Sequence, residues 1–223
     1  MNLTNADVTD DSQNYYLCLP KSGKGAGVFV LHAWWGLNPF FRGFCDRLAQ
    51  EGFVVLAPDL YRGRTATTIA GAKALRAKVR PIQVKTDILA AVERLRAHPA
   101  VTRRSLGVIG FSLGAYWALW LSLQKPEYVR AVTVFYGTRS ADYSDARAAY
   151  MGHFAETDDW ESESSVKKLN RSLRKANRPT TFHTYEGTGH WFFEKDRKTA
   201  YKEKAARLAW NRTLAFLQQE LHK

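Results

Sequence analysis

The chain has 223 residues, 45% of them hydrophobic and 24% charged, so it is long enough to bury a sizeable core. No apolar run approaches the roughly 18–20 residues that span a bilayer, and the polar, acidic residues 1–12 do not read as a signal peptide. The net charge is +12, but acidic residues are interleaved near the C-terminus and no nucleic-acid motif occurs, which predicts a solvated basic surface without nucleic-acid binding.

The first half of the chain alternates segments of strand and helix character. Asn38 and Pro39 predict a helix start, with asparagine as the N-cap and proline at the first helical position. The predicted elements, in chain order, are a strand at residues 15–19, a strand at 28–32, a helix at 38–50, a strand at 53–57, a short helix within 62–80 and a helix from 81.

The second half continues the alternation. Its predicted elements are a strand at 106–111, a helix at 115–123, strands at 131–136 and 150–155, a helix at 162–177, a strand at 180–185 and a last helix at about 199–221. Repeated strand–helix order predicts an α/β fold with a mostly parallel sheet covered on both faces. With no repeat or linker in the sequence, we expect one domain over residues 1–223, with 1–12 flexible.

The most informative motif is Gly110-Phe111-Ser112-Leu113-Gly114, which fits G-x-S-x-G. A predicted strand precedes it and a predicted helix follows it. That order is typical of a nucleophile elbow, whose sharp turn needs small flanking residues and exposes the serine hydroxyl at the end of the sheet. The motif therefore predicts Ser112 as a nucleophile; the alternative is a glycine-rich turn with a serine at the helix start.

A serine hydroxyl needs a base, usually a histidine oriented by a carboxylate. His190 follows the strand at 180–185 and is flanked by glycines, which favours it over the other histidines as the base. Asp158 and Asp159 both follow the strand at 150–155, and their spacing does not separate them; Glu156, nearer the strand, is a weaker candidate for the acid.

Hydrolysis through a serine also needs donors for the oxyanion. The backbone N–H of Leu113 directly follows the nucleophile, and the loop after the strand at 28–32 supplies the second donor, for which Trp34 is the best candidate. Tryptophans gather in these loops, and we expect Trp34, Trp35, Trp160 and Trp191 to line an apolar substrate pocket, the alternative being simple core packing.

Together these segments resemble the dienelactone hydrolase family of α/β-hydrolases. The matching residues run over most of residues 28–217 and comprise 32–40, 57–61, 110–114, 152–158, 189–192 and 209–217. The resemblance implies the α/β-hydrolase fold, a triad aspartate at Asp158 rather than Asp159, and an oxyanion donor at Trp34.

Several positions depart from the family pattern. Well-known members have a cysteine where Ser112 stands, a glutamate where Ala33 stands and a final elbow glycine where Ala115 stands. A serine needs no switch to control its ionisation, so Ser112 with Ala33 implies an ordinary serine-hydrolase mechanism. The family's carboxylate-binding arginine, four residues after the histidine, is replaced by Glu194.

The other arginine of that carboxylate site also has no clear counterpart here. Arg62, Arg64 and Arg76 are weak substitutes, in a segment at 62–80 that is a candidate cap over the site. These departures argue against dienelactone itself as the substrate.

We therefore expect a serine hydrolase that cleaves a carboxylic ester, thioester or lactone with Ser112, His190 and Asp158. The alternatives are a peptidase or acyltransferase on the same scaffold, or a non-catalytic binding protein. We expect a small-molecule substrate, no metal or organic cofactor and no membrane association; nothing in the sequence predicts an oligomeric state. Cys18 and Cys45, without a secretory signal, predict reduced thiols and a cytoplasmic location.

Overall fold

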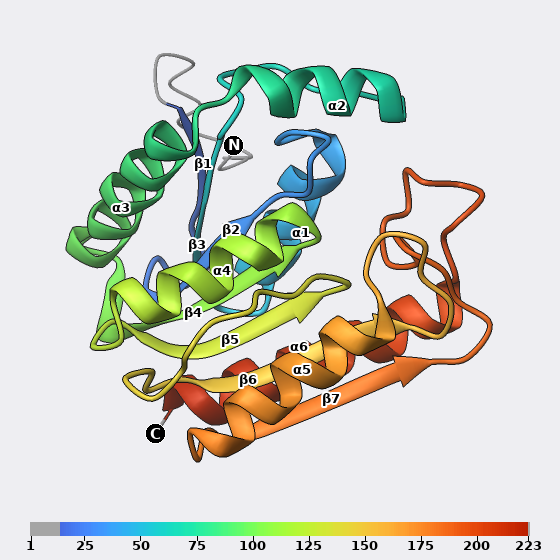
Figure 1. Cartoon of the computed structure of the whole chain (residues 1–223). Helices are drawn as coiled ribbons and strands as arrows, with labels where there is room; N and C mark the ends of the chain where they lie inside the picture. The colour runs from blue at the N-terminus through green and yellow to red at the C-terminus, as the bar shows by residue number, and fades with distance from the viewer. Residues whose placement is uncertain (1–13, 223) are drawn as a thin grey trace.

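A computed structural model describes residues 14–222; the predicted flexibility of residues 1–12 falls outside that range. Its centre is a seven-stranded sheet with the order β1-β3-β2-β4-β5-β6-β7 (Figure 1). Only β1 runs antiparallel to its neighbour among these strands. The strands are β1 (Tyr15–Cys18), β2 (Gly25–Leu31), β3 (Val54–Pro58), β4 (Val101–Phe111), β5 (Val129–Phe135), β6 (Ala149–Ala155) and β7 (Thr180–Tyr185).

Helices cover both faces of the sheet, as the sequence predicts. They are α1 (Pro39–Gln50), α2 (Ile69–Lys78), α3 (Pro81–Ala97), α4 (Leu113–Gln124), α5 (Glu163–Lys175) and α6 (Glu203–His222). Helices α1 and α6 pack on one face, and α3, α4 and α5 pack on the other (Figure 1). This arrangement confirms the predicted α/β-hydrolase architecture.

The sheet has one hydrophobic core on each face, because successive side chains along a buried strand point to opposite faces. In β2, Val28 and Val30 belong to the core under α1 and α6, whereas Phe29 and Leu31 belong to the core under α3, α4 and α5. All four side chains are fully buried, which explains why the strand reads as a continuous apolar run.

The start of α1 confirms the predicted cap. The Asn38 side chain accepts a hydrogen bond from the backbone N–H of Phe41 at 3.2 Å, and Pro39 occupies the first turn. Two other boundaries differ from prediction. Strand β4 begins five residues earlier, at Val101, because residues 102–104 are exposed and polar and so lack the apolar signal. Helix α6 begins at Glu203, since residues just before it form turns, with the Lys202 N–H bonded to the Phe192 carbonyl.

The short helix expected within residues 62–80 is α2. It lies across the end of the molecule near the start of α4, and Ala72 is its only buried residue (Figure 1). Within the described residues no helix is both long and apolar enough to cross a membrane.

Candidate active site

Ser112 occupies a sharp turn between β4 and α4. Its backbone has φ 50° and ψ −112°, a conformation that non-glycine residues rarely adopt. The Ser112 N–H donates to the Phe135 carbonyl at 2.9 Å, and the Ser112 carbonyl accepts from the Ala115 N–H. The turn is therefore held on both sides, and the serine side chain is presented at the carboxyl end of the sheet.

Three glycines make room for this turn. A Cβ at Gly110 would collide with the backbone of Gly114, and a Cβ at Gly114 would collide with the carbonyls of Leu31 and His32. A Cβ at Gly137 would lie 2.6 Å from the Ser112 carbonyl oxygen. The absence of side chains at these positions lets β2, β4 and the first turn of α4 approach closely.

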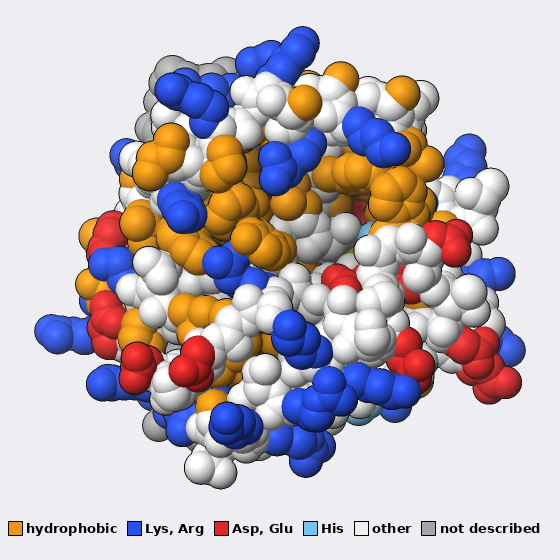
Figure 2. All heavy atoms as spheres, viewed as in Figure 1, with side chains coloured by type: hydrophobic (Ala, Val, Ile, Leu, Met, Phe, Trp, Pro, Cys, Tyr) orange, Lys and Arg blue, Asp and Glu red, His pale blue; other side chains and the backbone are white. Residues whose placement is uncertain are grey.

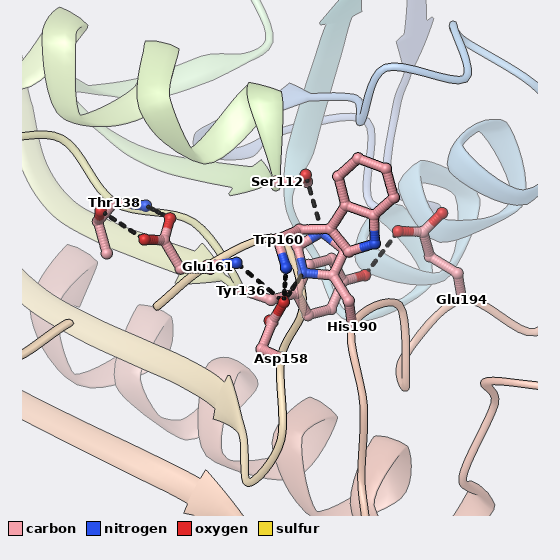
Figure 3. A network of polar contacts seen from close by, with 8 residues as sticks. All are labelled: Ser112, Tyr136, Thr138, Asp158, Trp160, Glu161, His190 and Glu194. Carbon is pink, nitrogen blue, oxygen red and sulfur yellow. Dashed lines mark hydrogen bonds and ion pairs between the residues drawn. The ribbon is translucent and has the colours of Figure 1, made fainter. Parts of the chain in front are cut away.

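His190 lies beside Ser112 from the loop after β7. Its Nε2 is 3.0 Å from the Ser112 Oγ, and its Nδ1 is 2.7 Å from Asp158 Oδ2 (Figure 3). The imidazole is buried. Neutral His190 with its proton on Nδ1 donates to Asp158 and offers Nε2 as the acceptor for the serine proton.

Asp158 is fixed by the backbone that follows it. Its Oδ1 accepts hydrogen bonds from the N–H groups of Trp160 and Glu161, at 2.8 and 2.9 Å (Figure 3). The neighbouring candidates are placed differently. Asp159 is exposed, and the Glu156 carboxylate accepts from the Gly187 N–H at the surface. Of the three acids, the structure brings Asp158 to the histidine.

The two candidate oxyanion donors lie on adjoining segments. The Leu113 N–H is the first of helix α4, where no helical carbonyl is available to it. Trp34 lies in the tight turn after β2, in which the Gly36 N–H donates to the Ala33 carbonyl. Gly114 lies against the Leu31 and His32 carbonyls, so this turn is next to the start of α4.

His32 supports the same turn. It is fully buried; its Nδ1 lies 2.6 Å from the Ala33 carbonyl, and its Nε2 accepts from the Leu60 N–H at 3.2 Å. Burial lowers the pKa of His32, so the ring is neutral and donates from Nδ1. It links the turn after β2 to the loop after β3.

A group of tryptophan rings lies next to His190. The Trp34 ring is 4.9 Å from Trp160 and 6.3 Å from Trp191, measured between centroids. Trp160 is 44% exposed, whereas Trp35 is buried behind the others with Arg197 over its ring. Trp34, Trp160 and Trp191 therefore form an aromatic surface near the histidine, and Trp35 packs in the core beneath it.

A second apolar feature is lined in part by Leu113, the residue that follows Ser112. A small pocket between α2, α3 and α4 is lined by Leu60, Tyr61, Arg76, Val79, Pro81, Val84, Leu113 and Trp117. Figure 2 shows a hollow below α2 that is framed largely by hydrophobic side chains. An apolar pocket lined by Leu113 thus accompanies the aromatic surface near His190.

Comparison with known proteins identifies the family. A model of the dienelactone hydrolase family matches residues 14–221. This chain belongs to the dienelactone hydrolase family. It is 32% identical over 215 residues to protein usf of Aquifex pyrophilus, an alignment covering 92% of this chain and 93% of that protein.

Other members agree with this assignment. The chain is 27% identical to carboxymethylenebutenolidase of Rhodococcus opacus over 214 residues, which cover 90% of this chain and 83% of the other. A crystal structure described as a "putative dienelactone hydrolase" from Klebsiella pneumoniae superposes with a TM-score of 0.80, at 25% identity and 92% coverage of both chains. Hydrolysis of an ester or lactone bond, the activity class that the sequence predicts, agrees with this membership.

In this member of the dienelactone hydrolase family, the departures from the family pattern have structural counterparts. Ala33 is fully buried, with no carboxylate at that position to face Ser112. Glu194 is also fully buried and accepts a hydrogen bond from the Tyr136 hydroxyl at 2.7 Å. A substrate carboxylate therefore cannot reach the Glu194 side chain.

Three residues of the network were not found by sequence reasoning. Glu161 accepts from both the N–H and the hydroxyl of Thr138, at 2.8 and 3.0 Å, and so ties the Asp158 loop to the loop after β5 (Figure 3). Burial raises the pKa of Glu161. Tyr136 packs against the His190 ring, with centroids 4.8 Å apart. No local motif marks them: Tyr136 is the last residue of the predicted strand at 131–136, Thr138 follows that strand, and Glu161 lies six residues after the predicted strand at 150–155.

Proposed function

We propose that this protein hydrolyses carboxylic esters, thioesters or lactones through an acyl-enzyme on Ser112. The observation that carries the proposal is the continuous hydrogen-bonded chain from Asp158 through His190 to Ser112, with the serine on a strained turn. Backbone strain of this kind gathers at functional sites.

The chemistry follows from the positions of these atoms. Ser112 Oγ attacks the carbonyl carbon while His190 Nε2 takes its proton, and Asp158 holds the imidazole in the tautomer that leaves Nε2 free. The tetrahedral intermediate collapses as His190 returns the proton to the leaving oxygen or sulfur. Water, activated by the same histidine, then attacks the acyl-enzyme and frees Ser112.

The Leu113 and Trp34 N–H groups are the proposed oxyanion hole. They lie at the start of α4 and in the adjoining turn, where the positive end of the helix dipole favours a developing negative charge. Loss of one such donor typically costs about 2.7–4 kcal/mol of transition-state stabilisation.

The aromatic surface of Trp34, Trp160 and Trp191 is proposed to bind an aromatic or apolar part of the substrate. Trp160 supports this role, because a ring that is 44% exposed next to the site offers contact area to a ligand. The expected result for Trp160→Ala is a kcat/KM that falls more for aryl esters than for methyl esters. Equal losses for both classes would exclude the aromatic surface from substrate binding.

The hydrolase function itself is tested with a panel of neutral alkyl and aryl esters, thioesters and lactones. Wild-type protein is expected to release acid and alcohol from at least one class, and Ser112→Ala to lose that activity while keeping its thermal midpoint. Addition of an alcohol acceptor separates hydrolysis from acyl transfer. A wild type that binds these compounds without turnover would favour the binding-protein alternative.

We also infer a reducing compartment such as the cytoplasm. Cys18 and Cys45 are both free and buried, and the Cys18 thiol donates to Asp46 at 3.3 Å. Burial raises the pKa of both thiols, which keeps them protonated and unreactive. Fractionation of cells that produce the protein natively tests this location.

A further inference from the structure

Glu194 has no exposed surface, although it lies in the same loop as His190 and only four residues after it. Its Oε1 accepts the hydrogen bond from the Tyr136 hydroxyl (Figure 3). Its N–H donates to the Trp191 carbonyl, and its carbonyl accepts from the Arg197 N–H. These turns direct the carboxyl into the protein, where a substrate cannot reach it.

Tyr136 connects this carboxyl to the candidate base. It directly follows β5, is fully buried and has φ 38°, a strained conformation for a residue with a side chain. Its N–H donates to the His153 carbonyl on β6 at 2.8 Å. Its ring lies against His190, with the centroids 4.8 Å apart. The backbone and the hydroxyl of Tyr136 are both fixed, so its ring is a rigid support beside the imidazole.

We propose that Glu194 is a positioning residue for His190 and acts through Tyr136. The Tyr136–Glu194 hydrogen bond joins the end of β5 to the His190 loop and keeps the imidazole directed at Ser112. This inference rests on the proposed function, because it assigns the support of the histidine that the proposed reaction uses.

The charge of Glu194 gives the proposal a specific signature. Burial and, to a smaller extent, the charge of Asp196 raise the pKa of Glu194, whereas the Tyr136 hydrogen bond and Arg197 lower it. The net result is a pKa of about 8. Besides Glu194, the acidic groups that act on Tyr136 are Asp196, in the same loop as Glu194, and Asp158, on the loop after β6. Glu194 is therefore neutral at pH 7 and ionises above about pH 8. An ionised carboxylate behind Tyr136 favours the imidazolium that forms as Ser112 loses its proton.

The test compares kcat and KM from pH 6 to 9.5 for wild type, Glu194→Gln and Tyr136→Phe, with exposed Glu51→Gln as the control. Glutamine keeps an acceptor for Tyr136 but cannot ionise. We expect its kcat to match wild type below pH 7 and to lack the wild-type increase above pH 8. Tyr136→Phe removes the hydrogen bond to Glu194. We expect kcat to fall about tenfold with KM unchanged, since misplacement of a reacting group by about 1 Å lowers the rate by up to roughly a hundredfold.

A second measurement does not depend on activity. In the unfolded chain the Glu194 carboxyl has its ordinary pKa of 4.5, whereas in the folded protein it keeps its proton until about pH 8. Wild-type stability from this group therefore falls as pH rises from about 4.5 to 8. Glu194→Gln lacks that fall, so its thermal midpoint is expected to gain on wild type between pH 5 and pH 9, and Glu51→Gln is expected to show no such trend.

The outcomes separate the two proposals. A wild type that hydrolyses esters, together with superimposable pH profiles for wild type and Glu194→Gln and an unchanged kcat in Tyr136→Phe, would overturn the positioning role alone. A purely structural role would lower the thermal midpoint of these variants and leave the pH profile unmoved. A wild type inactive on every ester would overturn the proposed function, and this inference with it.

Discussion

At the scale of single residues, the choice between two adjacent aspartates depends on the backbone that follows them. The N–H groups of Trp160 and Glu161 converge on the Asp158 carboxylate, which directs it toward His190. Asp159 has the same chemistry and faces solvent. Sequence spacing could not separate these residues, because the direction of a side chain in a loop is set by hydrogen bonds that form only in the folded chain.

This difference predicts the behaviour of a matched pair of variants. Asp158→Asn is expected to lower kcat/KM by about 10³–10⁴-fold, because an amide favours the wrong imidazole tautomer. Asp159→Asn is expected to stay within about twofold of wild type, as surface changes usually do. Steady-state kinetics on the best ester decides between them. A loss below tenfold in Asp158→Asn, or an equal loss in both variants, would contradict the assigned role.

Other residues of the site show what the sequence can and cannot predict. Ser112 and His190 are recognisable because their motifs carry local requirements, namely glycines at a sharp turn and a position after a strand. Glu161, Tyr136 and Glu194 have no such motif, and their importance lies in contacts with residues 23 to 58 positions away. The prediction that Trp35 lines the pocket illustrates the same limit, since nothing local distinguishes an aromatic at a surface from one behind it.

At the scale of elements, the strand–turn–helix unit around Ser112 depends on close packing of backbones. Gly114→Ala would place a methyl group against the Leu31 and His32 carbonyls, so it is expected to cost more than about 2 kcal/mol in the free energy of unfolding. Gly43, in α1, has open space around its Cα. Its change to alanine is expected to stabilise by about 0.4–1 kcal/mol. Urea denaturation measures both, and a stable Gly114→Ala would contradict this account of the turn.

Helix α2 is held differently from the helices on the sheet. The loop before α2 is fixed by Arg197, whose side chain donates a hydrogen bond to the Thr67 carbonyl at 3.0 Å. Lys73, in α2, lies over the Trp160 ring. Ala72 is its only buried residue, in contrast to the eight buried in α4. We therefore expect α2 to open locally, as a cap over the hollow in Figure 2 would need to.

Hydrogen exchange tests the cap. Amides in α2 are expected to exchange at least about tenfold faster than those in α4, and to slow when a phosphonate occupies Ser112. Equal protection in α2 and α4 in the free protein would mean that α2 is a fixed wall.

The alternation of elements could be read from the sequence because buried strands of a parallel sheet are continuous apolar runs. The boundaries of β4 and α6 could not, since exposed strand ends and helix-initiating turns carry polar residues that fit several structures. Packing against neighbouring elements decides those ends.

At the scale of the whole molecule, a single sheet runs through the described residues and shares its strands between two cores. We propose that the chain is one domain. A domain of this kind is expected to unfold in one cooperative transition, with tryptophan fluorescence and circular dichroism giving the same midpoint. Separate midpoints for the two probes would argue for independent units.

The net charge of +12 acts over the same scale. A positive surface attracts anionic substrates, and salt screens that attraction over about 8–10 Å at 0.1–0.15 M. We expect kcat/KM for an anionic ester to fall as salt rises from 20 to 300 mM, and kcat/KM for a neutral ester of similar size to stay constant. Parallel profiles for the two esters would show that the charge does not influence substrate capture.

The central claim is that Ser112 is an activated nucleophile, and fluorophosphonate labelling with intact mass and peptide mapping tests it most directly. The structure predicts one adduct per chain, located on Ser112, and none in Ser112→Ala or His190→Ala. Folded wild-type protein that gains no adduct, or gains it on another residue, would contradict the proposed mechanism.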